Sequence, residues 1–255
     1  MGDWLDPVRA GLDGRITPTM IFMRDDDAGW ADEQLYQLLE IVQDRELPLD
    51  VAAIPAAVTP ALARALSDAI DGMDGRVAVH QHGFSHVNHE STGRKSEFGP
   101  SRAEAQQRAD IVAGRRKLED AFGARLADIF TPPWNRCTET TANVLVELGF
   151  DLLSRDASAP AFGISGLGEL PVDLDWSGRR GASVGPIAWG QSIGRAIASA
   201  AQPVGLMLHH AVMTDEDRRL LRELLAVVAR HPMARVLSML QCFVEDCLAR
   251  SSGSV

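Results

Sequence analysis

The stretch TMIFMRDDDAGWADEQLYQLLEIVQDRE (residues 19–46) contains one strand, one polar loop and one helix in succession. Its first six residues (19–24) are mostly apolar and predict a short β-strand. Apolar residues then recur at helical spacing over 31–46, which predicts an amphipathic helix. Between the two lies RDDDAG (24–29), where three adjacent carboxylates directly follow a predicted core strand. Burying like charges side by side is costly, so this cluster needs a physical explanation.

The same alternation of short apolar runs and amphipathic segments continues along nearly the whole chain. Further strands are predicted at 49–55, 76–83, 126–133, 150–156, 169–176, 204–210 and 234–240. Strands that alternate with helices predict a parallel sheet covered by helices. The number of strands favours a distorted (β/α) barrel of seven or eight units over an open sheet. We expect residues 1–250 to form a single domain and the tail SSGSV (251–255) to be disordered.

Composition narrows the class of protein. The chain has 255 residues, 45% of them hydrophobic, and a formal net charge of −10. This acidic balance argues against nucleic acid or an anionic membrane as the main partner. The three cysteines form no CxxC pair, which argues against a disulfide framework or a zinc ribbon. No segment reads as a signal peptide or as a membrane span, so we expect a cytoplasmic protein without membrane insertion.

Unusual polar residues cluster at the carboxyl ends of the predicted strands. They are Asp25–Asp27, the histidines from His80 to His89, the loop TPPWN (131–135), Asp173 with Asp175 and Trp176, and finally His209 with His210. The carboxyl ends of parallel strands share one face of a barrel, and barrel enzymes assemble their active sites there from several loops. Five separate segments are therefore predicted to meet at one site.

The densest of these clusters is HQHGFSHVNH (80–89), which holds four of the seven histidines. A lone histidine there would most simply be a polar loop residue. Four in ten residues beside an aspartate cluster instead favour a metal site of the catalytic zinc type, with two histidines and one aspartate. The other clusters, taken singly, are equally well explained as rigid loops or polar strand ends.

The strand pattern also bears on the roles within RDDDAG. In a regular strand Asp25 and Asp27 share one face and Asp26 points to the other. That alternation favours Asp25 and Asp27 as the working pair. A divalent cation is the most economical explanation of the crowding, because it inverts the local electrostatic cost.

Taken in order, DDDAG, HGFSH, TPPWN, DLDW and LMLHH resemble the motifs of the polysaccharide deacetylase family, which is carbohydrate esterase family four with its NodB homology domain. The resemblance spans roughly residues 20 to 210. It implies a distorted (β/α) barrel and a metal-dependent hydrolase that removes acetyl groups from an N-acetylated sugar or sugar conjugate.

The resemblance also implies a metal centre. A pattern Arg-x-Asp-Asp-x-Gly assigns Asp26 as the base and Asp27 as a metal ligand. This requires the chain to leave strand geometry there, which Gly29 makes plausible. His82 and His86 complete the ligand set for one divalent ion, zinc in the first place, with cobalt, nickel or manganese as alternatives.

The same resemblance implies the remaining catalytic groups. Trp134 would offer its backbone N–H to the oxyanion, and His209 would be the general acid. The other residues expected at the oxyanion or the substrate are Asn135, Asp175, Trp176 and His210.

Departures from the family pattern leave some roles open. The loop arginine is replaced by Thr131 and the loop glycine by Asn135. Arg24 or Arg136 would have to replace that arginine. Glu97 would either reach the site or be a solvated loop acid, and we favour the latter. Asn88 and His89 would add to the metal shell or contact substrate, and Asp25 would be a supporting acid.

Three other functions are consistent with parts of this pattern. The first is a metal-dependent hydrolase of another small amide or ureide C–N bond. The second is a non-catalytic binding module on the same fold. The third is a magnesium site for phosphoryl transfer, which the missing Gly-rich phosphate loop and the many histidines make the weakest. The expected partner is a small molecule or carbohydrate, and nothing in the sequence indicates an oligomeric state.

Overall fold

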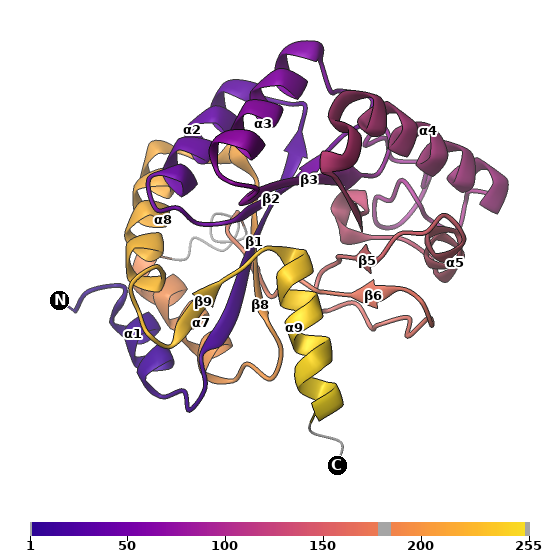
Figure 1. Ribbon diagram of the computed structural model, residues 1–255. Helices are drawn as coiled ribbons and strands as arrows, with labels where there is room; N and C mark the ends of the chain where they lie inside the picture. The colour runs from indigo at the N-terminus through magenta and orange to yellow at the C-terminus, as the bar shows by residue number, and fades with distance from the viewer. Residues whose placement is uncertain (1, 178–184, 253–255) are drawn as a thin grey trace.

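The computed structural model describes residues 2–177 and 185–252. Its centre is a parallel sheet in the order β6-β5-β4-β3-β2-β1-β8-β7, with β9 beside the start of β1 (Figure 1). The strands are β1 Thr19–Ala28, β2 Leu49–Ala53, β3 Val77–His82, β4 Leu126–Thr131, β5 Leu152–Leu153, β6 Gly168–Glu169, β7 Leu174–Asp175, β8 Val204–Leu208 and β9 Ala234–Val236. The predicted α/β barrel of parallel strands is confirmed.

One segment of chain joins the two ends of this sheet. Predicted as a single strand, it contains both β6 and β7. Leu170 donates its backbone N–H to Leu153 on the β5 side at 3.0 Å, and Asp173 donates to Gly205 on the β8 side at 2.9 Å. Residues 168–175 therefore lie between β5 and β8, and the sheet curls into a distorted barrel.

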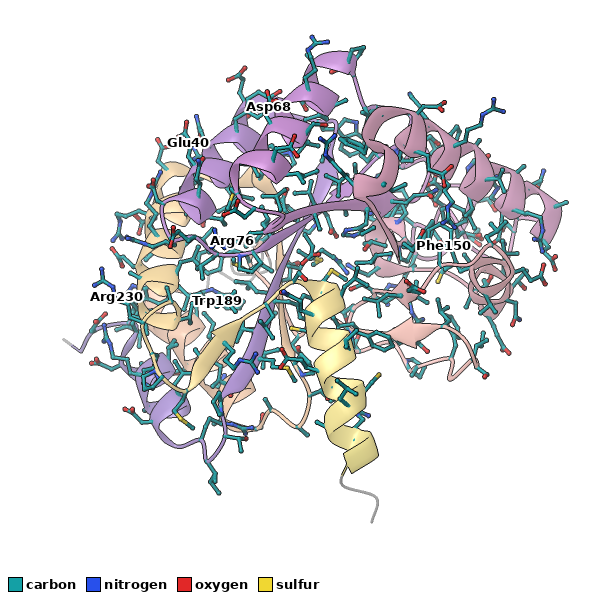
Figure 2. The ribbon with its side chains drawn as sticks, viewed as in Figure 1. Glu40, Asp68, Arg76, Phe150, Trp189 and Arg230 are labelled. Carbon is teal, nitrogen blue, oxygen red and sulfur yellow. The ribbon has the colours of Figure 1, made fainter. Side chains whose placement is uncertain are left out.

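Helices cover the outside of the barrel. They are α1 Asp6–Asp13, α2 Asp32–Gln43, α3 Pro60–Gly72, α4 Glu104–Phe122, α5 Glu139–Glu147, α7 Pro186–Ala198 and α8 Asp215–Val228. Short 3-10 turns are η1 Gly123–Arg125, η2 Pro133–Asn135 and η3 His210–Val212. Charged residues such as Glu40, Asp68 and Arg230 point outward into solvent (Figure 2). Among the described residues, no helix combines the length and apolarity that crossing a membrane requires.

The strands separate two kinds of core. Ile21 and Met23 belong to the large cluster shared with the outer helices, whereas Phe22 faces the lumen. Alternation along β1 therefore directs even-numbered side chains inward. The lumen-facing cluster lies at the amino-terminal end of the barrel and contains Phe22, Ile129, Leu152, Met207, Met239 and Cys242.

The final helix, α9 (Met239–Ser252), packs against that end of the lumen (Figure 1). The buried carboxylate of Asp50, from β2, accepts the backbone N–H of Met239 at 2.9 Å. Burial raises the pKa of Asp50 to about 7. Of the predicted disordered tail, Ser251 and Ser252 instead end α9, and 253–255 lie outside the described residues. Because α9 and the apolar cluster fill the amino-terminal end of the lumen, the carboxyl ends of the strands are left as the place for a functional site.

Candidate functional site

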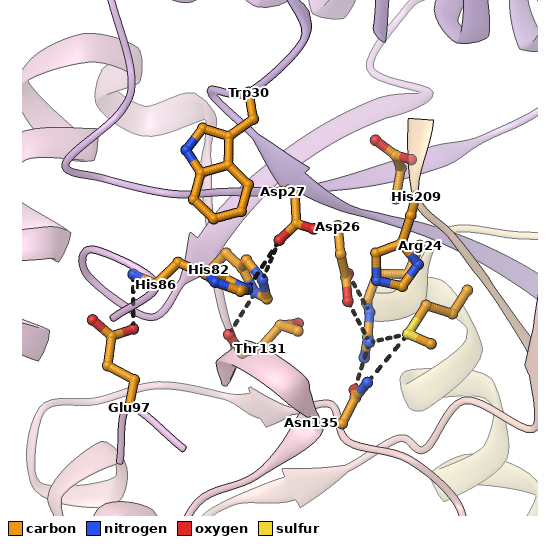
Figure 3. A network of polar contacts seen from close by, with 12 residues as sticks. Arg24, Asp26, Asp27, Trp30, His82, His86, Glu97, Thr131, Asn135 and His209 are labelled. Carbon is orange, nitrogen blue, oxygen red and sulfur yellow. Dashed lines mark hydrogen bonds and ion pairs between the residues drawn. The ribbon is translucent and has the colours of Figure 1, made fainter. Parts of the chain in front are cut away.

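Asp27, His82 and His86 meet at the carboxyl ends of β1 and β3 (Figure 3). The Oδ1 atom of Asp27 lies 3.2 Å from Nε2 of His82 and 3.2 Å from Nε2 of His86. Ligand atoms bound to one tetrahedral zinc ion at its usual bond lengths are about 3.3 Å apart. The spacing and the N,N,O donor set fit a zinc-type ion, so the structure brings the three predicted ligands together.

Asp27 reaches this position because β1 stops alternating. The pairing of β1 with β2 shifts register between Asp25 and Ala28, and Asp27 has φ +74°. A non-glycine residue at positive φ is uncommon, and aspartate tolerates it better than most. Gly29 follows at φ +113°, where a Cβ atom would come within 2.7 Å of the Ala57 side chain. The departure from strand geometry required by the Arg-x-Asp-Asp-x-Gly pattern is present.

Hydrogen bonds orient the ligands. The ring of His82 is buried, and its Nδ1 lies 3.0 Å from the backbone oxygen of Thr131. A carbonyl accepts only, so Nδ1 carries the proton and Nε2 presents its lone pair to a metal. When Nε2 of His82 and of His86 carries a proton instead, each ring donates to Asp27, and although burial opposes it these hydrogen bonds hold the pKa of Asp27 well below its usual range.

Glu97 holds the turn that carries His86. Its carboxylate is fully buried and accepts the backbone N–H groups of Phe84 at 3.2 Å, Ser85 at 2.8 Å and His86 at 3.2 Å. The turn is tight, with Gly83 and His86 both at φ +57°. A Cβ atom on Gly83 would lie 2.3 Å from Glu97 Oε2. The expectation that Glu97 is a solvated loop acid is wrong.

Arg24 holds the predicted base. Its guanidinium is fully buried and donates from Nε and Nη2 to the two oxygens of Asp26, each at 2.8 Å. It also donates to Ser154 Oγ at 2.7 Å and to Asn135 Oδ1 at 2.6 Å. Burial alone would raise the pKa of Asp26, but the Arg24 charge keeps it below its usual range. Of the two candidate arginines, Arg24 contacts Asp26, whereas Arg136 donates to the Lys95 carbonyl.

The TPPWN loop supports this centre from the β4 side. Trp134 and Asn135 have φ of +57° and +58°. The amide of Asn135 accepts a hydrogen bond from Arg24 and donates one to Met207 Sδ at 3.2 Å, so it helps to position the arginine. The His86 ring lies between two indoles, Trp134 at 4.4 Å and Trp30 at 4.7 Å between centroids.

His209 stands on the far side of Asp26 from the metal ligands (Figure 3). Its side chain is 24% exposed, and Nδ1 lies 3.8 Å from Asp175 Oδ1 and 3.5 Å from Ser177 Oγ. Asp175 also accepts the Ser177 backbone N–H at 2.8 Å. The structure thus places the predicted general acid at the site, with Asp175 beside its ring.

His210 is not at the substrate face, which corrects one expectation. It is fully buried, with Nδ1 2.6 Å from Asp25 Oδ2 and Nε2 2.7 Å from the Trp30 carbonyl oxygen. Its backbone N–H donates to Asp25 Oδ1 at 2.9 Å. Against the effect of burial, the Asp25 charge raises the pKa of His210 to about 9. Asp25 and His210 are therefore a buried pair that ties the Trp30 loop to β1 and to the peptide between His209 and His210.

The expectation for Trp176 needs correction, and Asn88 and His89 lie outside the predicted metal shell. Trp176 is 1% exposed and packs edge-on against Trp189 in the outer core, so it cannot stack on a substrate. Asn88 accepts the backbone N–H of Ser96 at 2.9 Å and shapes its own loop. His89 lies near Glu97 and Asp110 and is not among the ligands around Asp27.

No protein-family model matches this chain, and no curated protein matches it. Solved structures do. A candidate polysaccharide deacetylase from Mycobacterium smegmatis superposes with a TM-score of 0.62 at 18% identity, over 92% of this chain and 93% of that one. A family 4 carbohydrate esterase from Streptomyces lividans, in complex with acetate, gives 0.55 at 16% identity, over 86% and 91%.

A CE4 family pseudoenzyme from Bacillus anthracis gives a TM-score of 0.60 at 13% identity, over 89% of this chain and 66% of that one. Likeness at such identities shows a shared fold. The chain therefore has the fold of the CE4 polysaccharide deacetylases. Because the fold also occurs in a pseudoenzyme, function has to be argued from the side chains.

Proposed function

We propose that this chain is a metal-dependent hydrolase that removes acetyl groups from an N-acetylated sugar or sugar conjugate. One observation carries the proposal. A carboxylate fixed by a buried arginine, Asp26 with Arg24, lies between a three-ligand metal centre and a histidine, His209. Base, metal ligands and acid are the groups that amide hydrolysis requires.

Zinc fits the donor set best, and when bound it supplies an acidified water and a polarised acetyl carbonyl. Asp26 takes one proton from the attacking water. Arg24 keeps that carboxylate ionised and fixes its orientation. The backbone N–H of Trp134 is the proposed donor to the oxyanion.

His209 completes the reaction by giving a proton to the departing nitrogen as the C–N bond breaks, which leaves acetate and an amine. Asp175, 3.8 Å from Nδ1, orients the imidazole for that transfer. The alternative of another amide or ureide substrate rested on the missing loop arginine. Since Arg24 supplies an equivalent guanidinium, that alternative loses its main support.

The proposal is tested with metal-free protein loaded in turn with zinc, cobalt, nickel and manganese, by measuring acetate released from N-acetylglucosamine oligomers. Asp26→Asn and His209→Ala should each lower kcat by about 10² or more while zinc content stays unchanged. Wild-type turnover in either variant would refute its assigned role.

His82→Ala should lose the bound zinc because it removes one of three ligands. His231→Ala is the matched control, because His231 lies 3.1 Å from Asp13 and belongs to neither group of described residues that could hold a metal ion. Elemental analysis of the purified variants decides between them. Equal zinc content in the two would show that Asp27, His82 and His86 are not the metal centre.

A further inference from the structure

Three cationic residues gather beside the metal centre. Arg136 donates from Nη1 to the backbone oxygen of Lys95 at 2.9 Å, and Ser96 donates from Oγ to the Arg136 oxygen at 3.2 Å. These contacts hold the segment 94–96 against the end of the TPPWN loop. We call Arg94, Lys95 and Arg136 the basic rim.

The indole of Trp134 separates the basic rim from His86, a proposed metal ligand. The Lys95 ammonium is 6.0 Å from the Trp134 ring centroid, and the other neighbour of that indole is the His86 ring at 4.4 Å. Arg94 and Lys95 are both exposed. A substrate whose acetamido group reaches the metal centre would therefore pass close to the rim.

The rim's charge is not balanced by ion pairs within the described residues. No carboxylate there forms an ion pair with Arg94, Lys95 or Arg136, whereas Arg102, close by in the chain, pairs with Asp110 at 2.6 Å. Burial and the Arg94 charge lower the pKa of Arg136, and the charge of Asp156 opposes this effect without forming an ion pair with Arg136 within the described residues. The Nε atom of Arg136 is buried without a hydrogen-bond acceptor.

This concentration of positive charge is unusual on a chain whose formal net charge is −10. Such a surface repels anionic ligands at long range, whereas a local group of cations attracts and orients one. Arginine and lysine together are well suited to phosphate or carboxylate oxygens.

We infer that the substrate carries an anionic group, a phosphate or a carboxylate, which the basic rim binds while the acetamido group lies at Asp27, His82 and His86. This inference rests on the proposed deacetylase function and narrows its substrate class to acidic N-acetylated sugars. The rim supplies affinity and orientation, and Asp26 and His209 remain the groups that act on the amide.

The test compares three probes with the zinc-loaded protein: N-acetylglucosamine, N-acetylglucosamine 6-phosphate and N-acetylmuramic acid. Dissociation constants come from calorimetry, and kcat and KM from released acetate. One or both acidic probes should bind at least about tenfold more tightly than the neutral sugar, and added salt should weaken that preference. The phosphate and carboxylate probes distinguish the two anionic groups.

The double substitution Arg94→Gln with Lys95→Gln should remove about tenfold in affinity for the preferred acidic probe and change that for the neutral sugar by less than twofold. Arg222→Gln with Arg230→Gln is the matched control, because it removes the same charge from exposed positions on and after α8. An equal loss in both double variants would reduce the effect to net charge and overturn the inference.

Equal binding of neutral and acidic probes by the wild type would also overturn it, while acetate release would leave the deacetylase proposal standing. If no probe releases acetate, the deacetylase proposal fails, and the binding constants still decide whether the rim recognises an anion.

Discussion

At the scale of single residues, the geometry of the candidate site depends most on Arg24. The strand pattern alone favoured Asp25 with Asp27, and the family pattern chose Asp26 with Asp27. The structure shows what alternation could not: even positions of β1 enter the lumen, so Arg24 and Asp26 meet there, and only the bulge returns Asp27 to the same region. A bulge depends on tertiary contacts, which no periodicity in the sequence reports.

Arg24→Lys tests whether the two guanidinium hydrogen bonds to Asp26, the proposed base, are needed for catalysis. Lysine keeps the charge but loses the paired donors that fix both oxygens of Asp26. We expect kcat to fall by about 10-fold to 100-fold, with KM and zinc content nearly unchanged, because only the base is misplaced.

Steady-state kinetics and elemental analysis measure these quantities. Arg136→Lys is the control, since Arg136 was the other candidate for this role and does not contact Asp26. A fall in kcat as large in Arg136→Lys as in Arg24→Lys would contradict the assignment.

The adjacent histidines His209 and His210 show where sequence reasoning could have gone further. Neighbouring residues at the end of a strand point to opposite sides, so only one of them can face the lumen. Applied to LMLHH, that rule separates His209 from His210, and the structure then shows that His210 is the buried one, paired with Asp25. Trp176 follows the same logic, since Asp175 is the residue that faces His209.

At the scale of elements, the turn 83–86 is built around an acid from a distant loop. No pattern in the sequence links Glu97 to HGFSH, because the link consists of backbone N–H groups that any residue supplies. The histidine spacing was therefore predictable and the support of the turn was not.

Glu97→Gln should weaken zinc binding by about 10-fold to 100-fold, the usual effect of removing a group that orients a metal ligand. A glutamine brings an NH2 group towards backbone donors and loses the charge that they stabilise. Competition with a chromogenic chelator measures the affinity.

Glu90→Gln is the control, because Glu90 accepts hydrogen bonds from Ser101 away from the ligands. Zinc affinity in Glu97→Gln equal to that of Glu90→Gln would show that Glu97 does not position His86.

At the scale of the whole molecule, the barrel was predictable because alternation of strands and helices is a global pattern. Its closure was not. The sequence predicts one strand over 169–176, but the structure has two short strands in this region. β6 pairs with β5, and β7 pairs with β8. Hydrogen-bond partners change along the segment while its residue types do not signal the change.

The amino-terminal end of the barrel makes stability depend on pH. The pKa of Asp50 is raised by burial to about 7 from an ordinary value of 3.8, so the folded state binds its proton more tightly than the unfolded state. The contribution of Asp50 is therefore greatest at low pH and is lost as pH rises towards 7.

Asp50→Asn keeps an acceptor for the Met239 N–H and removes the charge. Relative to the wild type, its free energy of unfolding should increase by about 3 kcal/mol between pH 5 and pH 8. Urea denaturation at both pH values measures the change. Asp68→Asn, an exposed carboxylate, is the control, and the same pH trend in both variants would contradict the prediction.

Placing Arg24 and Asp26 on one strand also affects how such a protein can evolve. Where the arginine comes from a loop, the base and its support lie on separate segments, and a change to that loop disturbs catalysis. Here ten residues of β1 carry the proposed base, its arginine, a proposed metal ligand and the partner of His210. These four residues lie in one short segment and are therefore inherited together. Loops that do not contact these four residues are then freer to vary, so ligand preference can change while this segment is kept.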